Sequence, residues 1–281
     1  MADEYLRLGD MPREFQEILA REFVPYSVGM AWVSSQAKHT FAPFGSGTLV
    51  KKNGHTGVLT ARHCLKQMRH TSAGYDTVVL VLRDARAVYL APDSLFEHKL
   101  TIPLTAEYGP DLDFLEIAPC EQRQTISAVA SIWSLDREID ALLTNFATEG
   151  SLLVSGGFPE ERCKTTPISG GFRRVAYHLA YSNVIQKGDI IEKDGWDYIQ
   201  STCFYCDEND LPQSFGGTSG GGIWGVQVHR NEDTGKFSIG KSALVRVSFY
   251  QTERENNLRY VRGHFIKSIY DKAWRNFVDG K

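Results

Sequence analysis

Residues Ser214-Phe-Gly-Gly-Thr-Ser-Gly-Gly-Gly-Ile-Trp224 place glycines on both sides of Ser219. Glycine adopts backbone conformations that other residues avoid, so this segment can turn sharply and point several amide N–H groups into one small space. A serine hydroxyl is a poor nucleophile without a base, and the oxyanion formed by its attack on a carbonyl needs fixed hydrogen-bond donors. We therefore predict that Ser219 is a nucleophile and that the amides of Gly217 and Ser219 form an oxyanion hole. The alternative is a glycine-rich turn with an incidental serine.

A candidate general base lies upstream, at the end of an apolar run. The segment Gly57-Val-Leu-Thr-Ala-Arg-His-Cys64 is typical of a strand that carries His63 at its end. This position suits a base, which must be held rigidly and still be accessible. Most of the other seven histidines lie in polar or uninformative contexts, where a solvated or structural role is expected. His63 is therefore the predicted base.

Two aspartates compete for the role of orienting this histidine, in the segment Gly109-Pro-Asp-Leu-Asp-Phe-Leu-Glu-Ile117. A buried carboxylate can hold the histidine tautomer and stabilise the imidazolium that forms during attack. A strand counted from Asp111 leaves Glu116 toward solvent, whereas one counted from Asp113 puts Glu116 where an apolar residue is expected. We favour Asp111. Either aspartate could instead cap a turn or strand through local backbone hydrogen bonds.

The three segments together resemble the chymotrypsin/trypsin superfamily, in particular the divergent trypsin-like peptidases of prokaryotes. The motifs are TA-x-HC at residues 60–64, D-L-x-F-L at residues 111–115 and G-x-SGG at residues 217–221, in the order His, Asp, Ser. Residues 45–50 resemble the strand before the family's histidine, and residues 247–250 resemble the segment that pairs with a bound peptide. The resemblance spans residues 29 to 278.

The resemblance implies a serine endopeptidase that hydrolyses peptide bonds through a Ser219, His63 and Asp111 triad and an acyl-enzyme intermediate. It implies a polypeptide substrate and neither a cofactor nor a metal. The base of the primary specificity pocket would lie at Gln213, and the other implied substrate contacts are Ser248, Phe249 and Tyr250. A neutral amide at the base of that pocket makes no clear demand for a basic substrate residue.

The expected fold class is all-β, with two six-stranded antiparallel β-barrels of the chymotrypsin type. Short β-rich runs lie at residues 30–33, 47–50, 57–60, 77–82, 87–90, 151–157, 175–184, 196–202, 223–229 and 242–250. Strands at this spacing, separated by Gly, Asn and Asp, suggest a barrel or a sandwich. Apolar residues at helical spacing predict a short helix over residues 11–23 and another near the C-terminus, and residues 136–147 could form a helix or a connecting segment.

The domain organisation expected from these patterns is one large peptidase domain with an extension. Residues 1–28 would form an N-terminal helical extension, and residues 29–278 the peptidase domain. Its two barrel halves would cover approximately residues 29–130 and 131–262, followed by a C-terminal helix at residues 264–278. A chain of 281 residues with 42% hydrophobic content is long enough to bury such a core.

Two departures from the family pattern affect regulation and compartment. The position expected to hold a disulfide partner for Cys64 is Gly45 or Ser46, neither of which is a cysteine. Thr218 stands where zymogen-activated relatives have an aspartate that pairs with a newly cut N-terminus, so that mode of activation is not expected.

Composition indicates a soluble protein of a reducing compartment, and we expect a cytoplasmic location. The start of the chain is acidic and lacks the pattern of a secretory signal, and the apolar runs are too short to cross a membrane. Five cysteines do not make a disulfide framework, and the Cys203-x-x-Cys206 pair lacks the second pair that a zinc site needs. A formal charge of −3 without long charged blocks argues against a nucleic acid partner.

Two other functions remain open at this point. A catalytically silent trypsin fold could serve as a binding module, because sequence does not prove that an oxyanion hole forms. The segment around Ser219 also satisfies G-x-S-x-G, the nucleophile elbow of α/β-hydrolases, which would make the protein an esterase using His264. That fold requires a strand before the serine and a helix after it, and the sequence has a polar loop and a β-like run instead.

Overall fold

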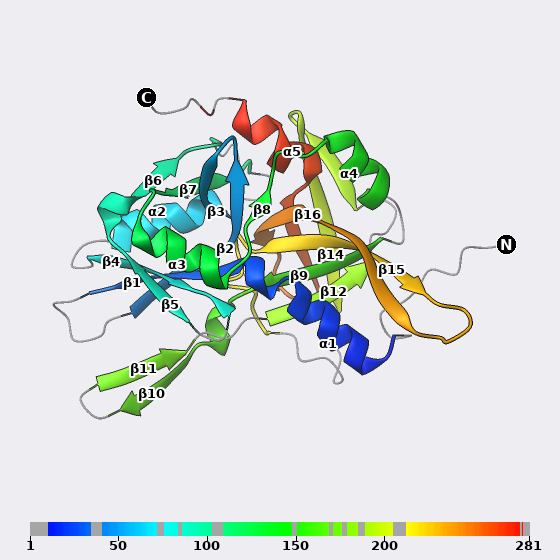
Figure 1. Cartoon of the computed structure of the whole chain (residues 1–281), viewed down its shortest axis with the longest axis horizontal. Helices are drawn as coiled ribbons and strands as arrows, with labels where there is room; N and C mark the ends of the chain where they lie inside the picture. The colour runs from blue at the N-terminus through cyan, green and yellow to red at the C-terminus, as the bar shows by residue number, and fades with distance from the viewer. Residues whose placement is uncertain are drawn as a thin grey trace.

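The computed structural model describes residues 11–34, 41–71, 76–83, 86–102, 109–147, 151–168, 171–175, 179–184, 189–204, 212–275 and 277. Two large sheets with antiparallel pairing between their main strands lie next to one another, with short helices around them (Figure 1). The predicted all-β class is confirmed, and each sheet curls as expected of a two-barrel fold.

The two edge strands of the first sheet follow one another along the chain, because a short turn divides one strand into two. Its strands are β1 (Ser27–Val33), β2 (Phe41–Lys52), β3 (His55–Thr60), β4 (Thr77–Val81), β5 (Ala87–Leu90), β6 (Leu95–His98) and β7 (Asp113–Ile117), in the order β5-β4-β1-β2-β3-β7-β6. The edge strands β5 and β6 are joined by the 3-10 turn η4 (Pro92–Ser94). Because proline cannot donate to a strand ladder, it interrupts the strand here. Counting β5 and β6 as one strand, and leaving aside the two-residue strand β8 (Trp133–Ser134) that pairs with β2, gives the six strands expected.

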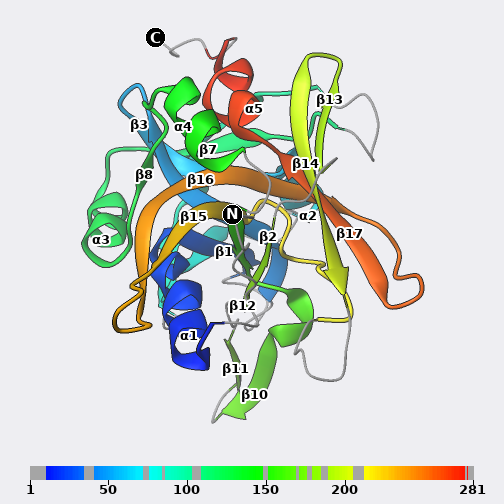
Figure 2. The same ribbon diagram turned by 90° about the vertical axis from the view of Figure 1, so that its right-hand side faces the viewer.

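The second sheet contains seven strands, one more than expected. They are β9 (Leu152–Gly157), β12 (Leu179–Val184), β13 (Ile190–Lys193), β14 (Trp196–Phe204), β15 (Gly222–Arg230), β16 (Phe237–Gln251) and β17 (Leu258–His264), in the order β12-β9-β15-β16-β17-β14-β13. Contacts between β12 and β14 show that the sheet curls back on itself. A separate hairpin, β10 (Lys164–Ile168) with β11 (Gly171–Val175), extends away from both sheets (Figure 2).

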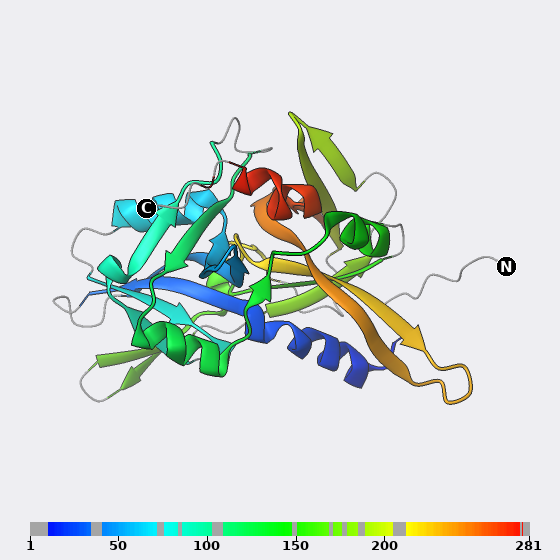
Figure 3. The ribbon, with the colours of Figure 1, turned by 45° about the horizontal axis from the view of Figure 1, so that its top comes forward.

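The helices differ from the sequence-based expectations mainly in their bounds. They are α1 (Arg13–Glu22), α2 (Arg62–Thr71), α3 (Glu121–Val129), α4 (Ile139–Phe146) and α5 (Ile266–Tyr270), with 3-10 turns η2 (Val24–Tyr26), η5 (Glu160–Arg162) and η6 (Lys272–Trp274). The segment 136–147 does form a helix, α4, which packs beside α5 (Figure 3). Helix α2, which begins next to His63, was not expected. None of the described helices is long and apolar enough to span a bilayer.

The C-terminal helix α5 is shorter than the predicted range 264–278, and a strand residue binds the free amides at its start. His264 still belongs to β17. The Asp197 carboxylate of β14 accepts hydrogen bonds from the amides of Lys267 (2.9 Å) and Ser268 (2.6 Å), which are free at a helix start. The helix therefore begins at Ile266 and ends at Tyr270.

Two strands of the first sheet extend past the residue numbers expected for the first barrel half. Strand β1 begins at Ser27, two residues before the expected boundary at residue 29. The two-residue strand β8 (Trp133–Ser134) pairs in parallel with β2, so the first sheet draws on residues beyond 130.

Aromatic packing joins the N-terminal helix and both sheets into one core. The Trp224 ring of β15 stacks on Phe23 at a centroid distance of 4.9 Å and meets Trp133 edge-on at 5.1 Å. Trp133 also donates a hydrogen bond to the Tyr270 hydroxyl, which in turn donates to the Leu244 carbonyl. Phe15 and Leu19 of α1 belong to the same core, which contains residues of both sheets.

Candidate active site

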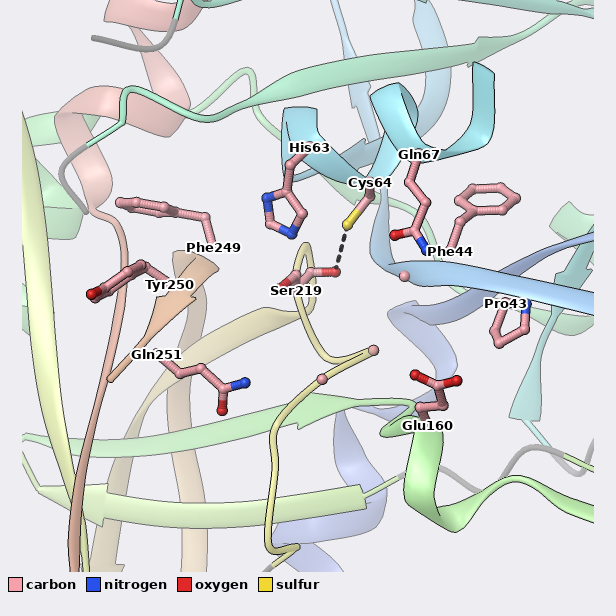
Figure 4. A pocket seen from close by; sticks show the side chains of 13 residues that line it. Pro43, Phe44, His63, Cys64, Gln67, Glu160, Ser219, Phe249, Tyr250 and Gln251 are labelled. Carbon is pink, nitrogen blue, oxygen red and sulfur yellow. Dashed lines mark hydrogen bonds between the residues drawn. The ribbon is translucent and has the colours of Figure 1, made fainter. Parts of the chain in front are cut away.

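The predicted nucleophile and base line one pocket of about 370 Å³ (Figure 4). Ser219 lies in the turn before β15, and His63 lies in the first turn of α2, the helix that follows β3. The pocket is lined by Pro43, Phe44, Gly45, His63, Cys64, Gln67, Glu160, Gly216, Gly217, Ser219, Phe249, Tyr250 and Gln251. Residues from β2 and α2 of the first half therefore face residues of β16 and the Ser219 turn of the second half.

Asp111 holds His63 through two hydrogen bonds. The amide of His63 donates to Oδ1 at 2.9 Å, and Nδ1 of the ring lies 2.5 Å from Oδ2. In the neutral imidazole this contact places the proton on Nδ1, which leaves the Nε2 lone pair free to accept a proton. The side chain of His63 is 45% exposed, so a substrate can reach that nitrogen.

The same contacts shift the pKa of His63 upward from its ordinary 6.5. Burial of part of the ring lowers the pKa of His63. The hydrogen bond to Asp111 and the neighbouring Cys64 sulfur have a larger, opposite effect, so the pKa is raised overall. The Asp111 carboxylate favours the imidazolium form that appears when His63 takes up a proton.

Asp111 is itself fixed by His264, which is fully buried behind it. The amide of Asp111 donates to Nε2 of His264 at 2.9 Å. His264 packs among aromatic rings, including Phe249 at 4.9 Å, and its burial lowers its pKa to about 3. It therefore stays neutral and accepts through Nε2. Because His264 is buried and does not line the pocket, the geometry gives no support to the esterase reading.

Asp113, the competing aspartate, faces a different partner. It begins β7, is fully buried, and its Oδ1 accepts from the Leu100 amide at 3.0 Å and lies 3.8 Å from Nη1 of Arg62. Burial raises the pKa of Asp113 to about 7, and the Arg62 charge opposes this shift. The structure thus brings Asp111 rather than Asp113 to His63.

The turn that carries Ser219 is fixed by Ser46 of β2. The Ser46 amide donates to the Ser219 carbonyl at 2.9 Å, and its hydroxyl donates to the Gly217 carbonyl at 2.6 Å. The same hydroxyl accepts from the Phe158 amide at 2.8 Å. Gly217 and Gly220 have φ values of +87° and +86°, which glycine adopts without strain.

Two amides in this turn are free to bind an anion. The Gly216 carbonyl accepts a hydrogen bond from the Glu160 amide at 2.9 Å. Because the peptide unit is planar and trans, the Gly217 N–H of the same unit points the opposite way. Within the described residues, neither the Gly217 nor the Ser219 amide donates to another protein group. Both are therefore available as oxyanion donors.

The hydroxyl of Ser219 is not hydrogen-bonded to the His63 ring in the described part of the chain. Hydrogen bonds of this kind are often long in the absence of substrate and tighten only when it binds. The two side chains lie in the same pocket (Figure 4). Asp111 holds the Nδ1 edge of the His63 ring.

Of the predicted substrate contacts, two line the pocket. Phe249 and Tyr250 do so, whereas the Ser248 hydroxyl donates to the Gly221 carbonyl at 3.0 Å. Gln213 does not line the pocket, because its amide oxygen accepts from Arg254 at 2.7 Å.

The amide that does line the pocket is Gln251, which sequence reasoning missed. Its Oε1 accepts from the Phe215 amide at 2.9 Å and from Arg259 Nη1 at 2.6 Å, so its orientation is set. Gln251 directly follows the segment 247–250, and this position in the sequence could have identified it as a pocket residue. Glu160, Gln67 and Ser46 were also missed, and only Ser46 lay within a quoted motif.

The cysteines remain thiols where the structure describes them. Cys64 is free, and its Sγ lies 3.5 Å from the Ser219 carbonyl. A Cβ atom on Gly45 would come within 2.5 Å of that sulfur, so Gly45 is the position facing Cys64. Cys203 is free and buried, and Cys206 lies outside the described residues. The described residues contain no cluster of ligands suited to a metal.

Comparisons with known proteins give similarity to solved structures but not to any family model or curated protein. No family model matches the sequence, and no curated protein matches it. Among solved structures, an HtrA-type protease with a decapeptide matches at 14% sequence identity and a TM-score of 0.42. The match covers 87% of this chain and 62% of that chain, so this chain spans less than two thirds of the length of that protein. A functional assignment therefore depends on the geometry of the pocket.

Proposed function

We propose that the protein is a serine endopeptidase with Ser219 as nucleophile, His63 as general base and Asp111 as the residue that orients His63. One observation supports this most: a two-point hydrogen bond from Asp111 holds His63 in the pocket that also contains Ser219. The free amides of Gly217 and Ser219 add the donors that an acyl-transfer site requires.

In the proposed reaction, Oγ of Ser219 bonds to the carbonyl carbon of the scissile peptide while Nε2 of His63 takes the hydroxyl proton. The carbonyl oxygen becomes an oxyanion that the amides of Gly217 and Ser219 stabilise. When the carbon–nitrogen bond breaks, His63 gives its proton to the leaving amine and an ester remains on Ser219. Water then attacks this ester by the same steps and releases the acid.

We further propose that the Ser219 turn is formed without cleavage of the chain. The Thr218 hydroxyl donates to the Phe215 carbonyl at 2.6 Å, and the Thr218 amide donates to the same oxygen at 2.9 Å. These local hydrogen bonds hold Thr218, which occupies the position where zymogen-activated peptidases have an aspartate that needs an ion pair with the cut N-terminus. Activity of the intact chain, with its N-terminus uncut, is the expected result, and a requirement for proteolysis would refute this part.

A reducing, cytoplasmic setting is proposed from the cysteines. Cys64 and Cys203 are free thiols, and free cysteines persist in compartments that keep thiols reduced. Alkylation without prior reduction should modify all five cysteines of the unfolded protein isolated from its host. Fewer modified thiols would indicate a disulfide and contradict the proposal.

The test of the function is cleavage of a peptide library, with products identified by mass spectrometry. We expect the intact protein to cut peptides at internal bonds. Removing Ser219 or His63 by substitution to alanine should reduce the rate by about 10⁴- to 10⁶-fold. Cutting that is unchanged in Ser219→Ala would show that another group or a contaminant is responsible. No cutting by the intact protein would favour the silent binding module.

A further inference from the structure

Glu160 supplies the acidic side chain of the pocket. Of the residues that line it, Glu160 alone carries a carboxylate, and none is a lysine or an arginine. The side chain of Glu160 is exposed, and among the described residues it makes no hydrogen bond or ion pair. An unpaired carboxylate in a binding pocket is available to a positively charged group of the substrate.

The backbone of Glu160 is fixed beside the oxyanion hole. Its amide donates to the Gly216 carbonyl at 2.9 Å, and its carbonyl accepts from the Cys163 amide at 2.9 Å in the turn η5. A Cβ atom on Gly217 would come within 2.8 Å of the Glu160 amide nitrogen, which shows how closely the two segments pack. The carboxylate therefore extends from a defined point next to the reacting carbonyl.

The position of Glu160 places it on one particular side of Ser219. In Figure 4, Phe249, Tyr250 and Gln251 lie on one side of Ser219, and Pro43, Phe44, Gln67 and Glu160 lie on the other. In the proposed endopeptidase, the acyl part of the substrate lies against Phe249 and Tyr250 of β16. The leaving part then passes the side that contains Glu160.

We propose that Glu160 selects substrates with a lysine or arginine within the first two residues after the scissile bond. This inference rests on the proposed endopeptidase function and adds its substrate class. The aliphatic part of a lysine or arginine side chain can lie along Pro43 and Phe44 while its charged end reaches the carboxylate. An acidic residue at the same place would be repelled.

The test compares matched peptides that differ only in one residue after the cleaved bond, which is lysine, glutamine or glutamate. The readout is the ratio of kcat/KM values for the lysine and glutamate peptides within each variant, so changes in overall activity cancel. A partly exposed ion pair predicts about a fivefold preference for lysine over glutamine, and a larger one over glutamate. Added salt should reduce the preference.

Substitutions at residue 160 make the test specific. Glu160→Gln should abolish the preference, and Glu160→Lys should reverse it in favour of the glutamate peptide. Glu232→Gln, which removes an exposed carboxylate in the distant turn between β15 and β16, is the matched control and should keep the ratio of the unaltered protein.

The outcomes separate this inference from the function on which it rests. Peptides cut without a lysine preference, or with one that Glu160→Lys leaves unchanged, would overturn the role of Glu160 and leave the endopeptidase standing. Failure to cut any peptide, together with failure of Ser219 to react with a fluorophosphonate, would remove the function and the inference with it.

Discussion

Asp111→Asn is the substitution that most sharply probes how His63 is held. In the intact protein, one carboxylate oxygen accepts from the His63 amide at 2.9 Å and the other faces Nδ1 at 2.5 Å. Asparagine has one oxygen and one NH₂ group. If its oxygen keeps the bond to the backbone amide, its NH₂ group faces Nδ1 and forces the proton onto Nε2. His63 would then have no lone pair facing Ser219.

The expected loss is about 10⁴-fold in the rate at which Ser219 reacts, because the wrong tautomer predominates. This corresponds to about 5.4 kcal/mol of transition-state stabilisation. The fold should survive, since the backbone hydrogen bond remains. The assay is the rate of covalent modification by a fluorophosphonate, with circular dichroism to confirm folding.

Asp113→Asn is the matched comparison two residues away. It should slow the reaction much less, because the Asp113 carboxylate contacts Leu100 and Arg62 rather than His63. Its effect should appear in the pH dependence of stability instead. The pKa of Asp113 is raised to about 7 in the folded state, so stability falls as pH rises from about 4 to about 7. Asp113→Asn should remove that fall. A larger rate loss for Asp113→Asn than for Asp111→Asn would refute the reasoning.

Three further outcomes are expected. Ser46→Ala leaves the Gly217 carbonyl and the Phe158 amide without their partner and should cost about 2–4 kcal/mol of unfolding free energy in urea, whereas Ser94→Ala, which removes a solvent-exposed hydrogen bond, should cost under about 0.5 kcal/mol. His264→Leu removes the acceptor for the Asp111 amide and should lower both the pKa of His63 and the labelling rate, and His264→Gln, whose amide oxygen can accept, should restore part of each. The labelling rate should rise with pH around a midpoint above 6.5, because His63 must lose its proton before it can act as a base.

Each of these three predictions would be contradicted by a specific result. A cost for Ser46→Ala no larger than that for Ser94→Ala would mean that the Ser219 turn does not depend on Ser46. An unchanged pH midpoint in His264→Leu would reduce His264 to a packing residue. A midpoint at or below 6.5 in the intact protein would contradict the hydrogen bond between Asp111 and the His63 ring.

The segments around the pocket were predictable because each is governed by short-range rules. The glycines on both sides of Ser219 predict a tight turn, and in the structure Gly217 and Gly220 have the positive φ values that such a turn needs. The pleat argument counted the strand from Asp111, whereas β7 begins at Asp113; Glu116 is nevertheless less buried than its neighbours, as that argument expected. That these segments meet in one pocket came from the family resemblance, since no local pattern encodes it.

The base of the specificity pocket could not be found by counting residues. Gln213 was placed there because of its distance from Ser219 along the chain. In the structure, the Glu161 carboxylate of η5 accepts from the amides of Gln213 and Ser214 at 2.9 and 3.1 Å. This contact between distant segments holds Gln213 outside the residues that line the pocket, and Gln251 lines it instead.

The ends of the terminal elements also depended on tertiary contacts. Apolar residues continue at helical spacing to Phe277, which is why a helix was expected to reach residue 278. Helix α5 ends at Tyr270, and the Phe277 ring packs on His55 and His98 at centroid distances of 5.1 and 4.8 Å. Periodicity marks which residues are buried, and packing determines where the helix ends.

Covalent labelling with a fluorophosphonate, followed by mapping of the modified residue, tests most directly whether Ser219 is an activated nucleophile. We predict a single adduct on Ser219 that forms in the unaltered protein and is absent from Ser219→Ala and His63→Ala. A native, folded protein that takes up no label at any pH, or that is labelled elsewhere while Ser219 stays unmodified, would contradict the account.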